Sequence, residues 1–190
     1  MLVFNDFVKE EHNKQLLQLL ESVEFPWYYQ KQAHTVHDPL SILSIGFSHV
    51  FVNNGEQTSD MLYVLEPLID ALESKLGALQ LLRAQANLLL NHKTEYIGTI
   101  HTDGFNGFET GNSTWVSAVY YVNDSNGDTV FFDKDGFEWN RVSPEKNKIV
   151  MFRGKQPHAA SLPTNYPTRL VININCLVIG DLQCSLDSVH

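Results

Sequence analysis

The stretch Leu82-Arg-Ala-Gln-Ala-Asn-Leu88 decides the fold. Its apolar residues alternate with Arg83, Gln85 and Asn87, which is the period of a β-strand with one buried face and one polar face. Before Gly77 the apolar residues recur instead with the period of a helix. The chain therefore changes from helix to strand near Gly77, and we expect a sheet from there onward.

More strands are expected after this stretch, over residues 98–101, 115–122, 129–132, 148–152 and 169–178. Sequences rich in Asn, Asp and Gly separate them, such as Asn123-Asp-Ser-Asn-Gly127 and Asp133-Lys-Asp-Gly136. Helices followed by many short strands favour an α+β protein whose main body is an antiparallel sandwich or jelly roll.

Two helices are expected before the strands. The first covers about residues 11–23, where Leu16 and Leu20 belong to a one-sided apolar stripe. The second begins near Ser59, a residue type that caps helices, and ends at Gly77. Pro67 lies inside the second pattern and predicts a kink or a division there.

Length and composition indicate one globular domain. The chain has 190 residues, of which 43% are hydrophobic and 18% charged. We expect a single domain over residues 1–190, with helical support over about 1–77 and a β core over about 78–180. The segment 181–190 has no clear period, and no pattern predicts an oligomeric state.

The charge of the chain argues against several kinds of partner. Its net charge is −9, from 13 basic and 22 acidic residues, which disfavours binding to nucleic acid or to an anionic membrane. Cys176 and Cys184 form no disulfide framework, and the first residues do not resemble a signal peptide. We therefore expect a cytoplasmic protein without nucleic-acid or membrane partners.

Two histidines, one aspartate and one arginine carry the chemistry that the sequence suggests. His101 and Asp103 stand two residues apart, and on an extended strand this spacing points both side chains to one face. His-x-Asp alone is common by chance, but His158 supplies a second imidazole and Arg169 follows it on an apolar run. Two His and one carboxylate form the ligand set of non-haem Fe(II) oxygenases, and guanidinium suits a dicarboxylate.

The order of these motifs along the chain carries a family resemblance. His-x-Asp is followed by Tyr120-Tyr-Val-Asn123, by Gly127-Asp-Thr-Val-Phe-Phe132, by Pro157-His158 and by the strand that Arg169 begins. This order, over roughly residues 82–178, resembles the 2-oxoglutarate and Fe(II)-dependent oxygenase superfamily. It is most similar to the prolyl-4-hydroxylase-like branch, including small members from phages and marine bacteria. The resemblance implies a double-stranded β-helix (jelly roll) core with the N-terminal helices packed on one sheet.

The resemblance also implies roles for single residues. The catalytic iron ligands would be His101, Asp103 and His158, and the residues that bind 2-oxoglutarate would be Arg169, Tyr121, Thr129 and Asn87. For Asn87 a purely structural hydrogen bond is the alternative. An Asp at 103, rather than Gly or Ala, argues against the related halogenases.

The implied activity is that of a dioxygenase acting as a hydroxylase. Its cofactors would be Fe(II), with 2-oxoglutarate and O2 as co-substrates and ascorbate as an optional addition. Hydroxylation of a C–H bond would be coupled to release of succinate and CO2. The partner would be a peptide, a protein or a small molecule; peptidyl proline is the first candidate, but the sequence does not name the substrate.

Two other classes of protein remain open. One is a cupin-like metalloenzyme that does not use 2-oxoglutarate, against which Arg169 and Tyr121 argue. The other is a non-catalytic binding domain with this fold, against which the complete set of ligands argues. A second histidine pair, His34 and His37, has no helical pattern around it and is not expected to bind a metal. The remaining histidines, among them His49, are expected at the surface or in loops.

Overall fold

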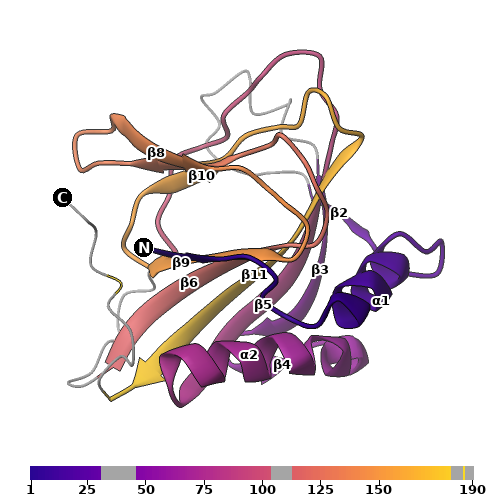
Figure 1. The fold of residues 1–190 in the computed structure, drawn as a ribbon, viewed down its shortest axis with the longest axis vertical. Coiled ribbons are helices and arrows are strands. Elements are labelled where there is room, and N and C mark those ends of the chain that lie inside the picture. Colours follow the sequence, from indigo (N-terminus) through magenta and orange to yellow (C-terminus); the bar gives the residue numbers. More distant parts are fainter. Residues whose placement is uncertain (31–45, 104–112, 181–185, 187–190) are drawn as a thin grey trace.

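The computed structural model describes residues 1–30, 46–103, 113–180 and 186. Within these ranges two antiparallel sheets face each other, and two helices cover the outer face of the larger sheet (Figure 1). The larger sheet has the order β1-β9-β6-β11-β5-β3-β2, with β4 paired to β3, and the smaller has the order β10-β7-β8. This α+β arrangement confirms the predicted jelly-roll core with helices packed on one sheet.

Strands from both halves of the chain build the larger sheet. They are β1 (Leu2–Phe4), β2 (Tyr28–Gln30), β3 (Gly46–Asn53), β4 (Glu56–Gln57), β5 (Leu79–Leu90), β6 (Ser113–Tyr121), β9 (Lys148–Arg153) and β11 (Thr168–Ile179). The smaller sheet contains β7 (Thr129–Phe132), β8 (Glu138–Val142) and β10 (His158–Ala160). Four of the larger sheet's strands come before residue 78, so the N-terminal part supplies sheet as well as helical support.

The helices cover the sheet through one apolar face each. Helix α1 (Glu10–Leu20) buries Leu16 and Leu20, and α2 (Glu66–Leu76) buries leucines at every fourth position, Leu68, Leu72 and Leu76. A 3-10 helix (Asp60–Leu65) precedes α2, and Pro67 lies in the first turn of α2, where its missing N–H leaves no helical hydrogen bond unmade. The division expected at this proline is therefore found.

The two faces of β11 have different tasks. The residues that pack toward the helices are apolar: Leu170, Ile172, Ile174, Cys176 and Val178. The residues between them face the other sheet: Arg169, Val171, Asn173 and Asn175. Strand β6 divides in the same way, since Tyr120 packs toward the helices and Tyr121 packs between the sheets. The period of two thus places a polar strip inside the sandwich.

Some expectations are wrong in detail. Residues 98–101 form no continuous strand, because pairing there consists of the isolated bridges Ile97–Ser161 and His101–His158. His49 is not a surface residue: it is 5% exposed, with Nδ1 3.0 Å from the Pro26 carbonyl and Nε2 2.8 Å from the Ser59 hydroxyl. In the described part of the chain, none of the helices is long and apolar enough to cross a bilayer.

Candidate active site

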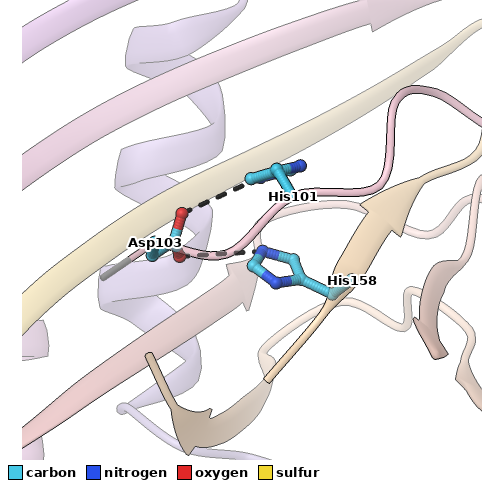
Figure 2. A group of neighbouring side chains, drawn as sticks. All are labelled: His101, Asp103 and His158. Carbon is cyan, nitrogen blue, oxygen red and sulfur yellow. Dashed lines mark ion pairs between the residues drawn. The ribbon is translucent and has the colours of Figure 1, made fainter. Parts of the chain in front are cut away.

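His101, Asp103 and His158 converge on one point between the sheets (Figure 2). Nε2 of His101 lies 3.8 Å from Oδ1 of Asp103, and Nε2 of His158 lies 3.6 Å from Oδ2 of the same carboxylate. The candidate ligand atoms of all three residues lie within 4.8 Å of one another. A single metal ion could therefore contact all three side chains, which meets the first requirement of a metal site.

Backbone pairing fixes the two histidines side by side. The N–H of His101 donates to the carbonyl of His158 over 3.0 Å, and the N–H of His158 donates back over 2.9 Å. Directly opposed residues of an antiparallel pair point to the same face, and here the ring centroids are 4.4 Å apart. The isolated bridge therefore holds both imidazoles on one face, which is the arrangement that a continuous strand over residues 98–101 was expected to provide.

Gly154 holds Asp103 against this pair. Its carbonyl accepts a hydrogen bond from the N–H of Asp103 over 2.9 Å, and its own N–H donates to the carbonyl of Trp115 over 3.0 Å. A Cβ on Gly154 would lie 2.0 Å from Cδ1 of Trp115, which is far inside van der Waals contact. Only glycine lets the backbone lie this close to the buried indole, so the position of the carboxylate depends on a missing side chain.

The hydrogen bonds of the two imidazoles use Nδ1 and leave Nε2 of each ring available to bind a metal. Nδ1 of His101 lies 3.0 Å from the carbonyl of Thr99, and Nδ1 of His158 lies 2.9 Å from the carbonyl of Gln156. Because a carbonyl only accepts, each Nδ1 carries the proton and each neutral ring keeps a lone pair on Nε2. Both Nε2 atoms face Asp103. Two imidazole nitrogens and a carboxylate are donors that suit Fe(II).

The environment of His158 keeps its ring neutral. Burial lowers the pKa of His158, and the nearby His101 and Arg169 lower it further, although the Asp103 carboxylate opposes the shift. Protonation would occupy the Nε2 lone pair. At neutral pH the buried imidazole is therefore in the form that binds a metal.

Asn175 orients the carboxylate from β11. Its Nδ2 donates to Oδ2 of Asp103 over 2.9 Å and to the hydroxyl of Ser117 over 3.1 Å. The alternation of Asn173 and Asn175 with apolar residues was visible in the sequence, but it fitted a solvent-facing strand equally well. Their position between the sheets makes the polar strip part of the site.

A cavity of about 440 Å³ lies beside the triad. Its wall includes His101 and Asp103 together with six polar residues of β5 and β11: Arg83, Gln85, Asn87, Arg169, Asn173 and Asn175. Its volume is within the range of small-molecule sites. Arg169 thus shares one chamber with two members of the triad.

Arg169 is a buried cation that forms no ion pair with a carboxylate in the described part of the chain, although the more distant charge of Asp128 acts on it. It is 4% exposed, and its Nε donates to the carbonyl of Gly127 over 2.6 Å while Nη2 donates to the hydroxyl of Thr129 over 3.0 Å. Burial lowers the pKa of Arg169, yet guanidinium stays charged in proteins. Because isolated buried charges are costly, an anionic ligand would stabilise this group.

Tyr121 and Thr129 contact the guanidinium rather than the cavity. The phenol of Tyr121 lies 2.7 Å from the hydroxyl of Thr129, and the Arg169 Cζ lies 5.8 Å from the centre of the Tyr121 ring. Burial raises the pKa of Tyr121 to about 12, so the phenol stays protonated. Neither residue contributes to the wall of the cavity. Both fix Arg169, and their direct contact with a co-substrate stays a prediction.

Asn87 combines the two roles that the sequence left open. It lines the cavity, and its Oδ1 also accepts a hydrogen bond from Nε2 of Gln85 over 2.6 Å. His34 and His37, for which no metal role is expected, lie outside the described residues.

One protein-family model matches the part of the chain that contains the triad. Residues 86–176, which hold the triad together with Asn87, Arg169 and Asn175, match the family model of the 2OG-Fe(II) oxygenase superfamily. A comparison with curated proteins finds no match. This part of the chain, just under half of its length, is similar to the 2OG-Fe(II) oxygenase superfamily, which uses Fe(II) and 2-oxoglutarate. The match favours this class over a cupin-like enzyme that does not use 2-oxoglutarate.

Solved structures share the fold at low sequence identity. A prolyl-4-hydroxylase from Pseudomonas putida has a TM-score of 0.58 at 18% identity, with 95% of this chain and 92% of that chain covered. A 2OG-Fe(II) oxygenase family oxidoreductase from Burkholderia pseudomallei reaches 0.66 at 12% identity, over 96% and 88%. HygX from Streptomyces hygroscopicus, solved with nickel, 2-oxoglutarate and hygromycin B, reaches 0.59 at 10% identity, over 92% and 81%.

Proposed function

We propose that the protein is a dioxygenase that depends on Fe(II) and 2-oxoglutarate, that it hydroxylates a C–H bond, and that His101, Asp103 and His158 hold its Fe(II). The observation that carries the proposal is the convergence of three donor atoms whose supporting hydrogen bonds are already made. Both Nδ1–H groups are held by carbonyls, and Asp103 is held by Asn175. Three protein ligands leave positions for 2-oxoglutarate and O2. When bound, the iron and 2-oxoglutarate supply the oxidising chemistry, with succinate and CO2 as by-products.

Arg169 binds the distal carboxylate of 2-oxoglutarate in this proposal. The guanidinium is buried and faces the cavity that His101 and Asp103 line, and no ion pair within the described ranges neutralises it. Tyr121, Thr129 and the carbonyl of Gly127 hold its orientation, so little rotational freedom is lost when a dicarboxylate binds. Asn87 completes the wall between the two ends of the co-substrate.

Aromatic residues keep the inner side of the site dry. The ring of Phe152 packs edge-on against the imidazole of His158, with 4.7 Å between centroids. The ring centroid of Phe131 lies 6.4 Å from that of His158. These contacts exclude water from one side of the imidazole, whereas the side chain of His101 is 51% exposed. Substrate therefore approaches from the side of His101.

Peptidyl proline is the first candidate substrate. The prolyl-4-hydroxylase from Pseudomonas putida shares the fold over nearly the whole chain, which supports a peptide substrate. HygX was solved with hygromycin B, so the same fold also accommodates a small molecule.

We further propose that residues 1–190 act as one domain and that the protein functions in the cytoplasm.

Succinate formation tests the proposed reaction. The protein would be incubated with Fe(II), 2-oxoglutarate, O2 and proline-containing peptides, each paired with a peptide in which alanine replaces proline. We expect succinate to form together with the addition of one oxygen atom to the proline peptides. His158→Ala should form neither product. Equal succinate from the parent and from His158→Ala would contradict the assignment of the ligands.

A further inference from the structure

Arg83 is a second cation in the cavity, and the co-substrate site described above does not use it. The side chain of Arg83 lines the cavity and donates one hydrogen bond to Oε1 of Gln85. No carboxylate of the described residues lies within ion-pair distance of it. Asp103 is the acidic residue on the same wall, but Asn175 holds it. The guanidinium of Arg83 therefore faces a polar chamber, and most of its N–H groups have no partner in the described part of the chain.

The backbone positions of Arg83 and Arg169 lie at opposite ends of the polar strip. In the pairing of β5 with β11, Arg83 lies opposite Asn175, whereas Arg169 lies opposite Leu89. At about 3.3 Å per residue, the two attachment points are roughly 20 Å apart along the strands. Arg83 thus belongs to the end of the strip where Asn175 holds Asp103. One dicarboxylate that extends from the triad to Arg169 leaves Arg83 without an anion.

A relay of hydrogen bonds makes this wall rich in donors. Arg83 donates to Oε1 of Gln85, and Nε2 of Gln85 donates to Oδ1 of Asn87 over 2.6 Å. Each amide oxygen already accepts one hydrogen bond, and within the described ranges the other N–H groups of Arg83 and the NH2 of Asn87 remain available to a ligand. A carboxylate only accepts hydrogen bonds and carries the opposite charge, so it matches this wall.

One acceptor in the wall adds a second requirement. Oδ1 of Asn173 is buried and has no hydrogen-bond partner among the residues that the structure describes, and Asn173 lies opposite Gln85 in the strand pairing. A buried acceptor without a partner is costly, so a ligand with an N–H or O–H group would be favoured there. The strip therefore fits a group in which a carboxylate lies near a hydrogen-bond donor.

We infer that the primary substrate presents a carboxylate to Arg83, at the triad end of the cavity, and that this contact selects the substrate. The inference rests on the proposed function. The carboxylate could belong to a free acid or to an acidic side chain beside the oxidised residue of a peptide. Both kinds of substrate would present a carboxylate beside an N–H group. The titrations described next distinguish the free acid from the acidic peptide.

Matched pairs of acids and amides test this inference. The protein loaded anaerobically with Fe(II) and 2-oxoglutarate would be titrated by calorimetry with N-acetyl amino acids and their primary amides. A second arm would use N-acetyl-prolyl-glutamate amide against N-acetyl-prolyl-glutamine amide. We expect the acid of at least one pair to bind roughly ten- to hundred-fold more tightly than its neutral partner. The arm that shows the preference identifies the source of the carboxylate.

Variants assign the preference to Arg83. Arg83→Gln should remove the preference for the acid and leave the affinity for 2-oxoglutarate unchanged. Lys14→Gln, which removes one charge from the exposed side of α1 on the opposite face of the sheet, should retain it. The inference is overturned if no pair shows a preference or if the preference survives in Arg83→Gln. It is also overturned if Arg83→Gln weakens 2-oxoglutarate binding as strongly as Arg169→Ala does.

The same titrations separate this inference from the proposed function. If the parent protein fails to bind Fe(II) and 2-oxoglutarate, the ligand assignment falls. A preference for acids that Arg83→Gln abolishes would then still establish an anion site. If Fe(II) and 2-oxoglutarate bind but acids and amides bind alike, the oxygenase assignment stands and the role of Arg83 is wrong.

Discussion

Asn175 donates a hydrogen bond of 2.9 Å to the carboxylate of Asp103 and lies on the same strand as Arg169. One strand thus orients a candidate iron ligand at one end and supplies the candidate co-substrate ligand at the other. The alternation of β11 makes this arrangement available, because its helix-facing residues form the core while the residues between them remain free to be polar.

Asn175→Ala should lower the affinity for Fe(II) by roughly ten- to hundred-fold, because residues that orient metal ligands typically contribute that much. The carboxylate would lose a donor and gain rotational freedom. Affinity would be measured by anaerobic titration with Fe(II). Asn173→Ala, two positions earlier on the same face, removes no hydrogen bond to Asp103 and should leave the iron affinity unchanged. Equal affinities in all three proteins would refute the orienting role.

Arg169→Ala should raise the 2-oxoglutarate concentration needed for half-maximal turnover by roughly ten- to hundred-fold, because charge-assisted hydrogen bonds would be lost from a buried site. Fe(II) affinity should stay near that of the parent. Arg169→Lys keeps the charge without the forked geometry and should be affected less. Unchanged turnover of Arg169→Ala at low 2-oxoglutarate would show that the carboxylate binds elsewhere.

Gly154→Ala should destabilise the fold by about 1–3 kcal/mol, since its Cβ would overlap the indole of Trp115. The hydrogen bond from Asp103 to the carbonyl of Gly154 should shift with the backbone and weaken iron binding as well. Urea unfolding gives the free energy of unfolding, and an iron titration gives the second effect. Trp115→Leu in the same chain should recover part of the loss, because it removes the overlapping atoms; an additive double variant would argue against the clash.

Acidification should weaken both metal binding and stability through His158. Burial puts the pKa of the folded imidazole below its ordinary value of 6.5, so the unfolded chain takes up the proton first. The contribution of His158 to the free energy of unfolding is thus fully present above about pH 6.5 and is lost as pH falls through the lower, folded pKa. Urea unfolding from pH 8 to pH 5 should show this decline, and His158→Gln should show a smaller one. A steeper decline in His158→Gln would contradict the assignment.

The sequence predicted the fold where local patterns decide it. Strand β7 was placed at its observed bounds, and Pro67 marked the division before α2, because period and proline chemistry act within a few residues. The short strands β1, β8 and β10 were missed. Segments of three to five residues carry too few positions for a period to emerge, and their pairing is set by distant partners.

The sequence predicted those parts of the candidate site whose chemistry only a few types of side chain can perform. Imidazole, carboxylate and guanidinium at His101, Asp103, His158 and Arg169 have few alternatives as iron and dicarboxylate ligands. The support by Asn175 and the space that Gly154 leaves for Trp115 could not be foreseen. Asparagine and glycine serve many purposes, and only the folded structure brings each of them to its partner.

Anaerobic addition of Fe(II) and 2-oxoglutarate tests the proposed site most directly. Chelation of Fe(II) by 2-oxoglutarate produces a metal-to-ligand charge-transfer band, so the parent protein should develop this band in proportion to one iron per chain. His158→Ala should not develop it, and Arg169→Ala should require far more 2-oxoglutarate. A parent protein that binds Fe(II) but shows no such band at saturating 2-oxoglutarate would contradict the proposal.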